Sequence, residues 1–150
     1  MRRIQLGLLA IVLLVAASLT VLSAKPLVRA HGQFWGTLYF AGMPLDLQVA
    51  FNVQDRGEPG DDRGSISIRL FDQGSGKLAG VVLSKRVFDV HLTADGRVSF
   101  FAEVRGAGGD PLPGPPVWQF WAKDDGAADE FCMLNPFLEV LDRGKIVIRY

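Results

Sequence analysis

Cysteine and histidine are scarce in this sequence, which limits its chemistry. Cys132 is the only cysteine, and His31 and His91 are the only histidines, among 150 residues. A single cysteine cannot form an internal disulfide, and no second histidine or cysteine completes a zinc ligand set around His91. Cys132 stands between Phe131 and Met133, so we expect a buried, inert thiol rather than a nucleophile.

Catalytic and phosphate-binding motifs are also lacking. No serine stands in a nucleophile elbow, and no glycine-rich phosphate loop precedes a helix. Outside the first 30 residues no amphipathic helical pattern occurs. These features argue against most enzyme classes and against a helical fold.

The N-terminal segment has the parts of a secretory signal. Two arginines follow Met1, an uncharged apolar run extends from Leu6 to Leu22, and small residues follow it. We predict a signal peptide over residues 1–30, with cleavage after Ala24 or Ala30, and a secreted or periplasmic product. An uncleaved N-terminal anchor is the alternative, and it would be the protein's only contact with a membrane.

The charge of the remaining chain is mildly acidic. Residues 1–30 hold four of the 16 basic residues and none of the 16 acidic ones, which leaves 12 basic against 16 acidic residues, a net charge of minus four. Nucleic acids and anionic lipids are bound through basic patches. We therefore expect no nucleic-acid partner.

Short alternating segments dominate the rest of the chain. In residues 45–53 apolar side chains occupy every second position, which indicates a strand with one buried and one wet face. Similar segments recur every ten to fifteen residues. In the segment 78–92 the inward face switches near Lys85-Arg86, which predicts either a bulge there or two separate strands. Residues 135–144 are expected to form an irregular crossover or a short helical turn. The prediction is an all-β fold, an antiparallel β-sandwich or barrel of about eight strands, as a single domain over residues 31–150.

An acidic hairpin is the most distinctive local feature. The apolar run 117–122 meets a turn at Lys123-Asp124-Asp125-Gly126. The carboxylates that could bind calcium there are Asp124, Asp125, Asp129 and Glu130. The segment lacks the alternating ligands and distal glutamate of an EF-hand loop, and a solvated turn is the competing interpretation.

Three tryptophans suggest a contact surface. Trp35, Trp118 and Trp121, together with the loop 106–116 that is rich in glycine and proline, are the predicted ligand-binding residues. The leading hypothesis is an exported, non-enzymatic binding or interaction module, stabilised by calcium if the acidic hairpin is a site. Its partner would be a protein, a glycan or a small apolar ligand.

The alternative hypothesis is a small secreted hydrolase- or isomerase-like β-barrel. Asp89 and His91 share a strand face at spacing i and i+2, and they or the acidic hairpin would act as acid and base.

The C-terminal third resembles a group of small secreted β-rich bacterial proteins, the post-COAP-type domains. The resemblance rests on Phe120, Asp125-Gly126, Asp129 with Phe131, and the closing segment 144–148 (GKIVI), with Gly32-x-Phe34 and residues 51–53 (FNV) as weaker echoes. The proline-rich loop 106–116 and the final Arg149-Tyr150 depart from it. The resemblance implies a secreted β-domain and supplies no activity, substrate or catalytic residue.

Overall fold

The computed structural model describes residues 27–40, 42–57, 60–109, 111–112, 114–126, 128–134, 139–141 and 143–150. Most of the predicted signal peptide, residues 1–26, lies outside the described residues. So do residues 135–138 and 142 of the predicted crossover, whereas residues 139–141 and 143–144 lie in strands, so the crossover prediction is wrong there. Among the described residues no helix is long and apolar enough to span a membrane.

Nine antiparallel strands form one sheet, which confirms the predicted all-β fold. The strands are β1 (Arg29–Phe40), β2 (Met43–Gln54), β3 (Arg63–Asp72), β4 (Leu78–Leu92), β5 (Val98–Gly106), β6 (Val117–Lys123), β7 (Glu130–Met133), β8 (Glu139–Leu141) and β9 (Arg143–Arg149). Their order is β8-β7-β6-β5-β4-β3-β2-β1-β9. Neighbours along the chain are neighbours in the sheet except for β9, which returns to pair with β1.

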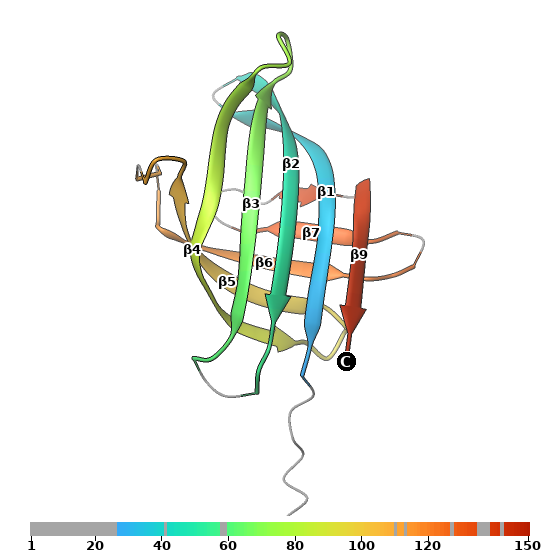
Figure 1. The fold of residues 1–150 in the computed structure, drawn as a ribbon. Helices are drawn as coiled ribbons and strands as arrows, with labels where there is room; N and C mark the ends of the chain where they lie inside the picture. The colour runs from blue at the N-terminus through green and yellow to red at the C-terminus, as the bar shows by residue number, and fades with distance from the viewer. Residues whose placement is uncertain are drawn as a thin grey trace, which may run out of the picture.

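The sheet folds over on itself into two layers. Figure 1 shows β9, β1, β2 and β3 side by side in front, with β5, β6 and β7 crossing behind them. Strand β4 belongs to both layers, since its first half pairs with β3 and most of its length pairs with β5. The result is a nearly closed, barrel-like sheet whose two end strands are β8 and β9.

The alternation of residues decides which side chains enter the interior. In β2, Leu47, Val49, Phe51 and Val53 are buried, whereas the residues between them are exposed or half-buried. Period-two placement puts these four on one face of the strand. The alternation that predicted this strand is thus confirmed from Leu47 to Val53, and Leu45 at its start is half-buried.

Phenylalanine rings fill the space between the layers. Phe34 and Phe51 come from the front layer, and Phe100, Phe120 and Phe131 come from the back layer. Their ring centroids lie 5.1 to 5.9 Å apart in successive pairs. All five are buried. Burial of large aromatic rings is the main apolar contribution to such a core.

Strand β4 bends at two bulges where it passes from one layer to the other. The ladder between β4 and β5 shifts between Ser84 and Arg86 and again between Phe88 and His91, which confirms the predicted bulge. Side-chain oxygens replace missing ladder bonds here. The Ser84 hydroxyl accepts a hydrogen bond from the Ile66 amide (2.9 Å), and a carboxylate oxygen of Asp62 accepts one from the Val90 amide (2.7 Å).

The β-domain begins before residue 31. Strand β1 starts at Arg29, the Val28 and Ala30 side chains are fully buried, and the Val28 carbonyl accepts a hydrogen bond from the Asp55 amide (2.8 Å). The predicted signal segment 1–30 therefore includes residues that pack in this core, and cleavage after Ala24 preserves them whereas cleavage after Ala30 does not.

We predict that a chain beginning at His31 is less stable than one beginning at Lys25. Losing the Val28 side chain and its backbone hydrogen bond should lower the free energy of unfolding by about 2 to 4 kcal/mol. Urea unfolding of the two purified chains measures the difference. Equal unfolding midpoints would contradict the packing described for Val28 and Ala30.

Glycine is required where β9 meets β1. A Cβ atom added to Gly144 would strike the Gln33 carbonyl oxygen and lie 2.7 Å from the Phe34 ring. At Gly80 in β4, by contrast, the nearest atom to an added Cβ is a Leu70 methyl carbon at 3.5 Å, an ordinary contact.

We predict that Gly144→Ala lowers the free energy of unfolding by about 1 to 3 kcal/mol, because the backbone or the Phe34 ring must move. Gly80→Ala is the matched control and should leave stability unchanged or raise it by up to about 1 kcal/mol. Chemical denaturation of both variants tests the pair. A tolerated alanine at residue 144 would show that β9 packs less closely on β1.

Candidate binding face and the acidic hairpin

The outward side chains of β9, β1, β2 and β3 form a continuous surface, which we call the front face. Cross-strand register brings residues that are distant in sequence together on it. Gln33 lies opposite Ala50 on one side and Lys145 on the other. His31 lies opposite Asn52 and Val147 in the next outward row.

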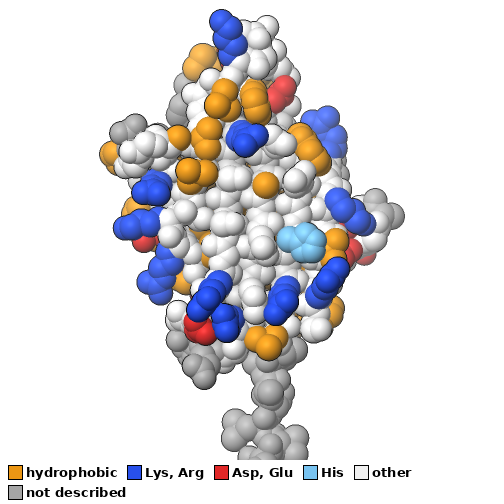
Figure 2. All heavy atoms as spheres, viewed as in Figure 1, with side chains coloured by type: hydrophobic (Ala, Val, Ile, Leu, Met, Phe, Trp, Pro, Cys, Tyr) orange, Lys and Arg blue, Asp and Glu red, His pale blue; other side chains and the backbone are white. Residues whose placement is uncertain are grey.

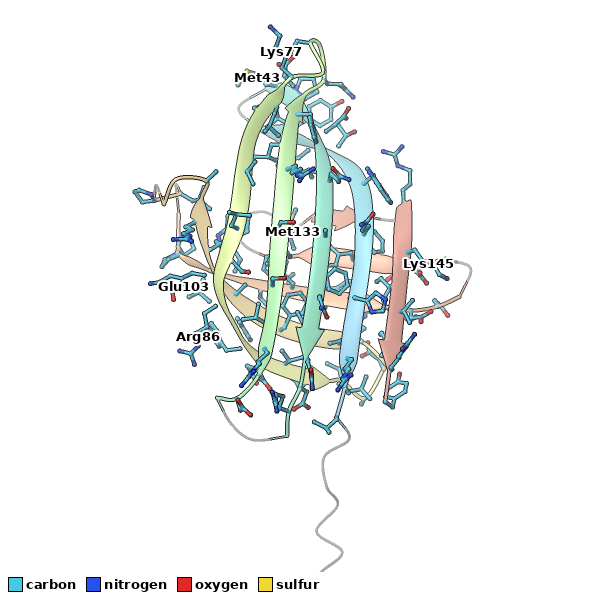
Figure 3. All side chains as sticks on the ribbon, viewed as in Figure 1. Met43, Lys77, Arg86, Glu103, Met133 and Lys145 are labelled. Atoms are coloured by element: carbon cyan, nitrogen blue, oxygen red, sulfur yellow. The ribbon has the colours of Figure 1, made fainter. Side chains whose placement is uncertain are left out.

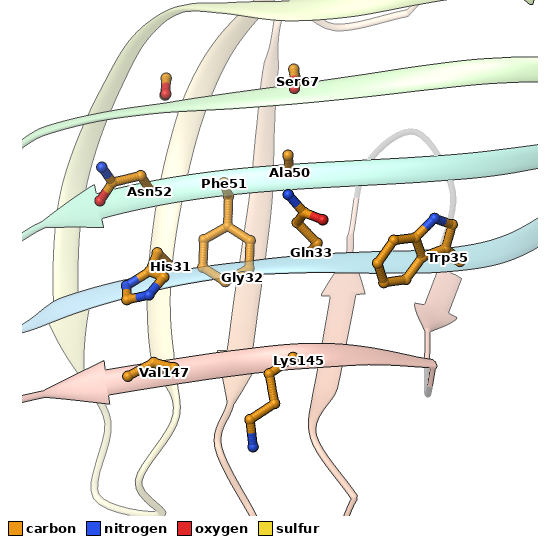
Figure 4. A pocket seen from close by; sticks show the side chains of 11 residues that line it. His31, Gly32, Gln33, Trp35, Ala50, Phe51, Asn52, Ser67, Lys145 and Val147 are labelled. Carbon is orange, nitrogen blue, oxygen red and sulfur yellow. The ribbon is translucent and has the colours of Figure 1, made fainter.

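A shallow depression of about 480 Å³ lies in the lower part of the front face. Figure 4 shows its residues: His31, Gly32, Gln33, Trp35, Ala50, Phe51, Asn52, Ser65, Ser67, Lys145 and Val147. Small side chains form the floor, and amide, imidazole, ammonium and indole groups stand around it. Gly32 has no side chain, and a Cβ atom added there would lie 3.0 Å from the Phe51 ring on the inner side of the sheet.

Trp35 is the aromatic group of the front face. Its side chain is 43% exposed, although it lies in the middle of β1 between Gln48 and Arg143. A second hollow of about 460 Å³, which also contains Thr37 and Asp46, begins on its other side. The indole thus stands between two depressions, in reach of a ligand that extends along the strands.

Positive charge gathers on the front face. Figure 2 shows many Lys and Arg side chains and few Asp or Glu on this side. The outward basic residues of the four strands are Arg29, Arg63, Arg69, Arg143, Lys145 and Arg149. Among the described outward positions of these strands, Asp46 is the one carboxylate, and it accepts hydrogen bonds from Thr37 (3.1 Å) and Gln73 (3.3 Å).

The other two predicted tryptophans lie elsewhere. Trp118 points into the core, is 8% exposed and donates its indole N–H to the Pro115 carbonyl (3.0 Å). Trp121 points outward from the back layer, where the Arg97 guanidinium lies 4.3 Å from its ring centroid. The three tryptophans therefore do not share one surface, and only Trp35 belongs to the front face.

The acidic hairpin connects the two layers. Asp129 is nearly buried, and its two carboxylate oxygens accept hydrogen bonds from the Asp125 amide (3.1 Å) and from the Ile146 amide in β9 (2.7 Å). Asp124 accepts a longer one from the Ile148 amide (3.3 Å). These two carboxylates bind amides of β9 on the side away from β1, where a further strand would otherwise pair.

The carboxylates of this hairpin do not gather around one point. Asp125 faces solvent and pairs with Lys123 (3.1 Å), and Glu130 is half-buried at the start of β7. Within the part of the chain that the structure describes, no three His, Cys, Asp or Glu side chains lie close enough to hold a metal ion. Calcium binding at this hairpin stays a prediction.

Asp89 and His91 lie at the second bulge of β4. Asp89 has a positive φ of 52°, and its carboxylate is 3.5 Å from the His91 Nδ1 atom. The Asp89 side chain is 61% exposed. Neither residue belongs to the depressions of the front face.

Two carboxylates with shifted acidity lie in exposed hairpin turns. Hydrogen bonds from the Ser75 side chain and amide lower the pKa of Asp72, and a hydrogen bond from the Thr93 hydroxyl, aided by the Arg97 charge, lowers the pKa of Asp95. Neither carboxylate lines either depression. These shifts reflect turn geometry.

Sequence reasoning missed most of the front face. Gln33, Asn52, Ser67 and Lys145 were not singled out, although the alternation that identified β2 also marks its outward positions as a wet face. Trp35 on the adjacent strand β1 was the further signal that these outward positions belong to a binding surface. Which strands pair, and so which outward residues meet, is not encoded locally.

Comparison with models of known protein families, with curated proteins and with solved structures found no match. The resemblance to post-COAP-type domains therefore stays a prediction.

We predict that Asp129→Ala lowers the free energy of unfolding by about 2 to 4 kcal/mol, because it leaves the buried Ile146 amide without its acceptor. The matched control is Asp125→Ala in the same turn, which removes an exposed ion pair and should cost less than about 1 kcal/mol. Urea unfolding with a constant slope measures both changes. Equal losses for the two variants would show that Asp129 does not join the layers.

Proposed function

We propose that this chain is an exported, non-enzymatic binding module that holds a glycan on its front face. The observation behind the proposal is the depression beside Trp35. An exposed indole stands at one end of it, and two amide side chains, two serine hydroxyls and an imidazole line the rest, over a floor of small residues. Export rests on the signal pattern in residues 1–30.

The chemistry of the depression suits a sugar. A pyranose ring presents C–H groups that pack on an aromatic face, and hydroxyls that both donate and accept hydrogen bonds. Gln33 and Asn52 offer an amide donor and acceptor each, and Ser65 and Ser67 offer hydroxyls. Rigid strands hold these groups at fixed spacing, which favours recognition of a repeating ligand.

The packed interior favours the outer surface over an internal pocket. Stacked phenylalanine rings occupy the space between the layers, with centroid separations of 5.1 Å for Phe51 and Phe131 and 5.3 Å for Phe100 and Phe120. Of the partners expected from the sequence, a glycan or a protein then agrees better with the fold than a small apolar ligand that needs a cavity.

The enzymatic alternative has weaker support. Asp89, which is exposed, and His91, which is half-buried, lie outside both depressions. The acidic hairpin engages its most buried carboxylate, Asp129, with backbone amides. General acid–base catalysis requires such groups to reach a bound substrate in a pocket.

Binding to a panel of immobilised neutral and acidic polysaccharides tests the proposal. We expect retention of the wild-type chain by at least one polysaccharide. Trp35→Ala should weaken that binding by about ten- to hundredfold, which corresponds to about 1 to 3 kcal/mol for loss of a stacked aromatic group.

The control variant is Trp121→Ala, which removes the outward tryptophan of the back layer. It should bind as the wild type does. Thermal midpoints of both variants exclude unfolding as the cause of any loss. If no polysaccharide retains the wild-type chain, or if the two variants lose binding equally, the front face is not a glycan site.

A further inference from the structure

The charge of the front face narrows the class of ligand. We infer that the glycan is an acidic polysaccharide, one whose repeating units bear carboxylate or sulfate groups. This inference rests on the proposed glycan site and adds to it the electrostatic contribution of the surrounding arginines and lysine.

The basic residues surround the depression from several strands. Lys145 lies at its wall on β9, Arg143 lies opposite Trp35, and Arg69 lies opposite Gln48 one strand further. Arg29 and Arg149 face each other at the far end of the same face. Figure 3 shows Lys145 beside β9, where nothing covers it in this view.

Most of these cations are available to a ligand. Among the described residues, Arg63 and Lys145 have carboxylate partners, and both are as far as 3.8 Å away, which is a weak contact. Arg29, Arg69, Arg143 and Arg149 are exposed and make no ion pair within the described part of the chain. A surface of one charge sign attracts a polyanion over the screening length of the solvent.

The floor of the depression favours a polysaccharide over the other common polyanions. A flat bilayer surface would meet the exposed amides of Gln33 and Asn52 around the depression and leave the half-buried Ser67 hydroxyl on its floor without a partner. Single-stranded nucleic acid is bound through successive aromatic platforms, whereas Trp35 is the one aromatic side chain that lines the depression from the outer surface. A chain of acidic sugars satisfies both the charged rim and the polar floor.

The decisive experiment uses one polymer backbone with different charges. Binding to dextran, carboxymethyl dextran and dextran sulfate is measured by affinity electrophoresis or biolayer interferometry. We expect both charged polymers to bind and neutral dextran to bind at least about tenfold more weakly. Raising the salt from about 0.1 M to about 1 M shortens the screening length from about 10 Å to about 3 Å and should remove most of the binding.

Two double variants separate this face from the rest of the surface. Arg143→Gln with Lys145→Gln should weaken binding to the charged polymers by about tenfold. Lys85→Gln with Arg86→Gln removes the same number of charges near the β4 edge, away from the depression in Figure 3, and should leave binding unchanged. Thermal midpoints confirm that all variants are folded.

The outcomes distinguish the two proposals. Trp35-dependent binding to neutral polysaccharides that resists salt would overturn the acidic-ligand inference and leave the glycan site intact. Binding to dextran sulfate that ignores Trp35→Ala would overturn it too, since charge alone would then suffice. If the chain binds phosphatidylglycerol vesicles or single-stranded DNA more tightly than it binds the charged dextrans, the assignment of the front face to glycans is wrong.

Discussion

The hydrogen bond from the Ile146 amide to the Asp129 carboxylate is the interaction on which the closed shape depends. Strand β9 is an end of the sheet, and β8, the other end, is not its ladder partner. An end strand leaves a row of amides without acceptors, and buried amides of that kind are costly. Asp129 supplies a charged acceptor to one of them at 2.7 Å, and Asp124 supplies a second to Ile148. Asp129 and Asp124 thus accept hydrogen bonds that the carbonyl groups of a further strand would accept in a fully closed barrel.

The same solution recurs where β4 leaves the front layer. A strand that bends between layers cannot keep its ladder, so amides near the bend need other acceptors. The Ser84 hydroxyl and the Asp62 carboxylate accept hydrogen bonds from Ile66 and Val90. Together with Asp129 they show that polar side chains accept hydrogen bonds from backbone amides at the β9 edge and at the β4 bend. The front layer between those places is regular, which keeps its outward side chains in fixed register.

Local sequence patterns predicted the strands, and for a physical reason. A half-buried strand needs apolar groups at every second residue, which β2 displays from Leu45 to Val53. The sequence also predicted the acidic hairpin, but it did not predict that the carboxylates of this hairpin bind backbone amides of β9. Asp129 binds Ile146, 17 residues away, and such a partner follows from topology rather than from spacing along the chain. Trp118 and Trp121 were grouped for the same reason, because a strand with apolar residues on both faces does not reveal which one points inward.

Net charge proved a poor guide to the surface. An excess of acidic over basic residues beyond residue 30 argued against polyanionic partners, yet strand pairing collects Arg29, Arg69, Arg143, Lys145 and Arg149 on one face. Several acidic residues lie instead in turns and at the junction of the layers, where Asp62, Asp124 and Asp129 serve backbone amides. These carboxylates, which accept hydrogen bonds from backbone amides, do not lie on the front face. The structural use of acidic residues therefore leaves the regular part of the sheet basic, and a surface with this segregation attracts anions whatever the sum of its charges.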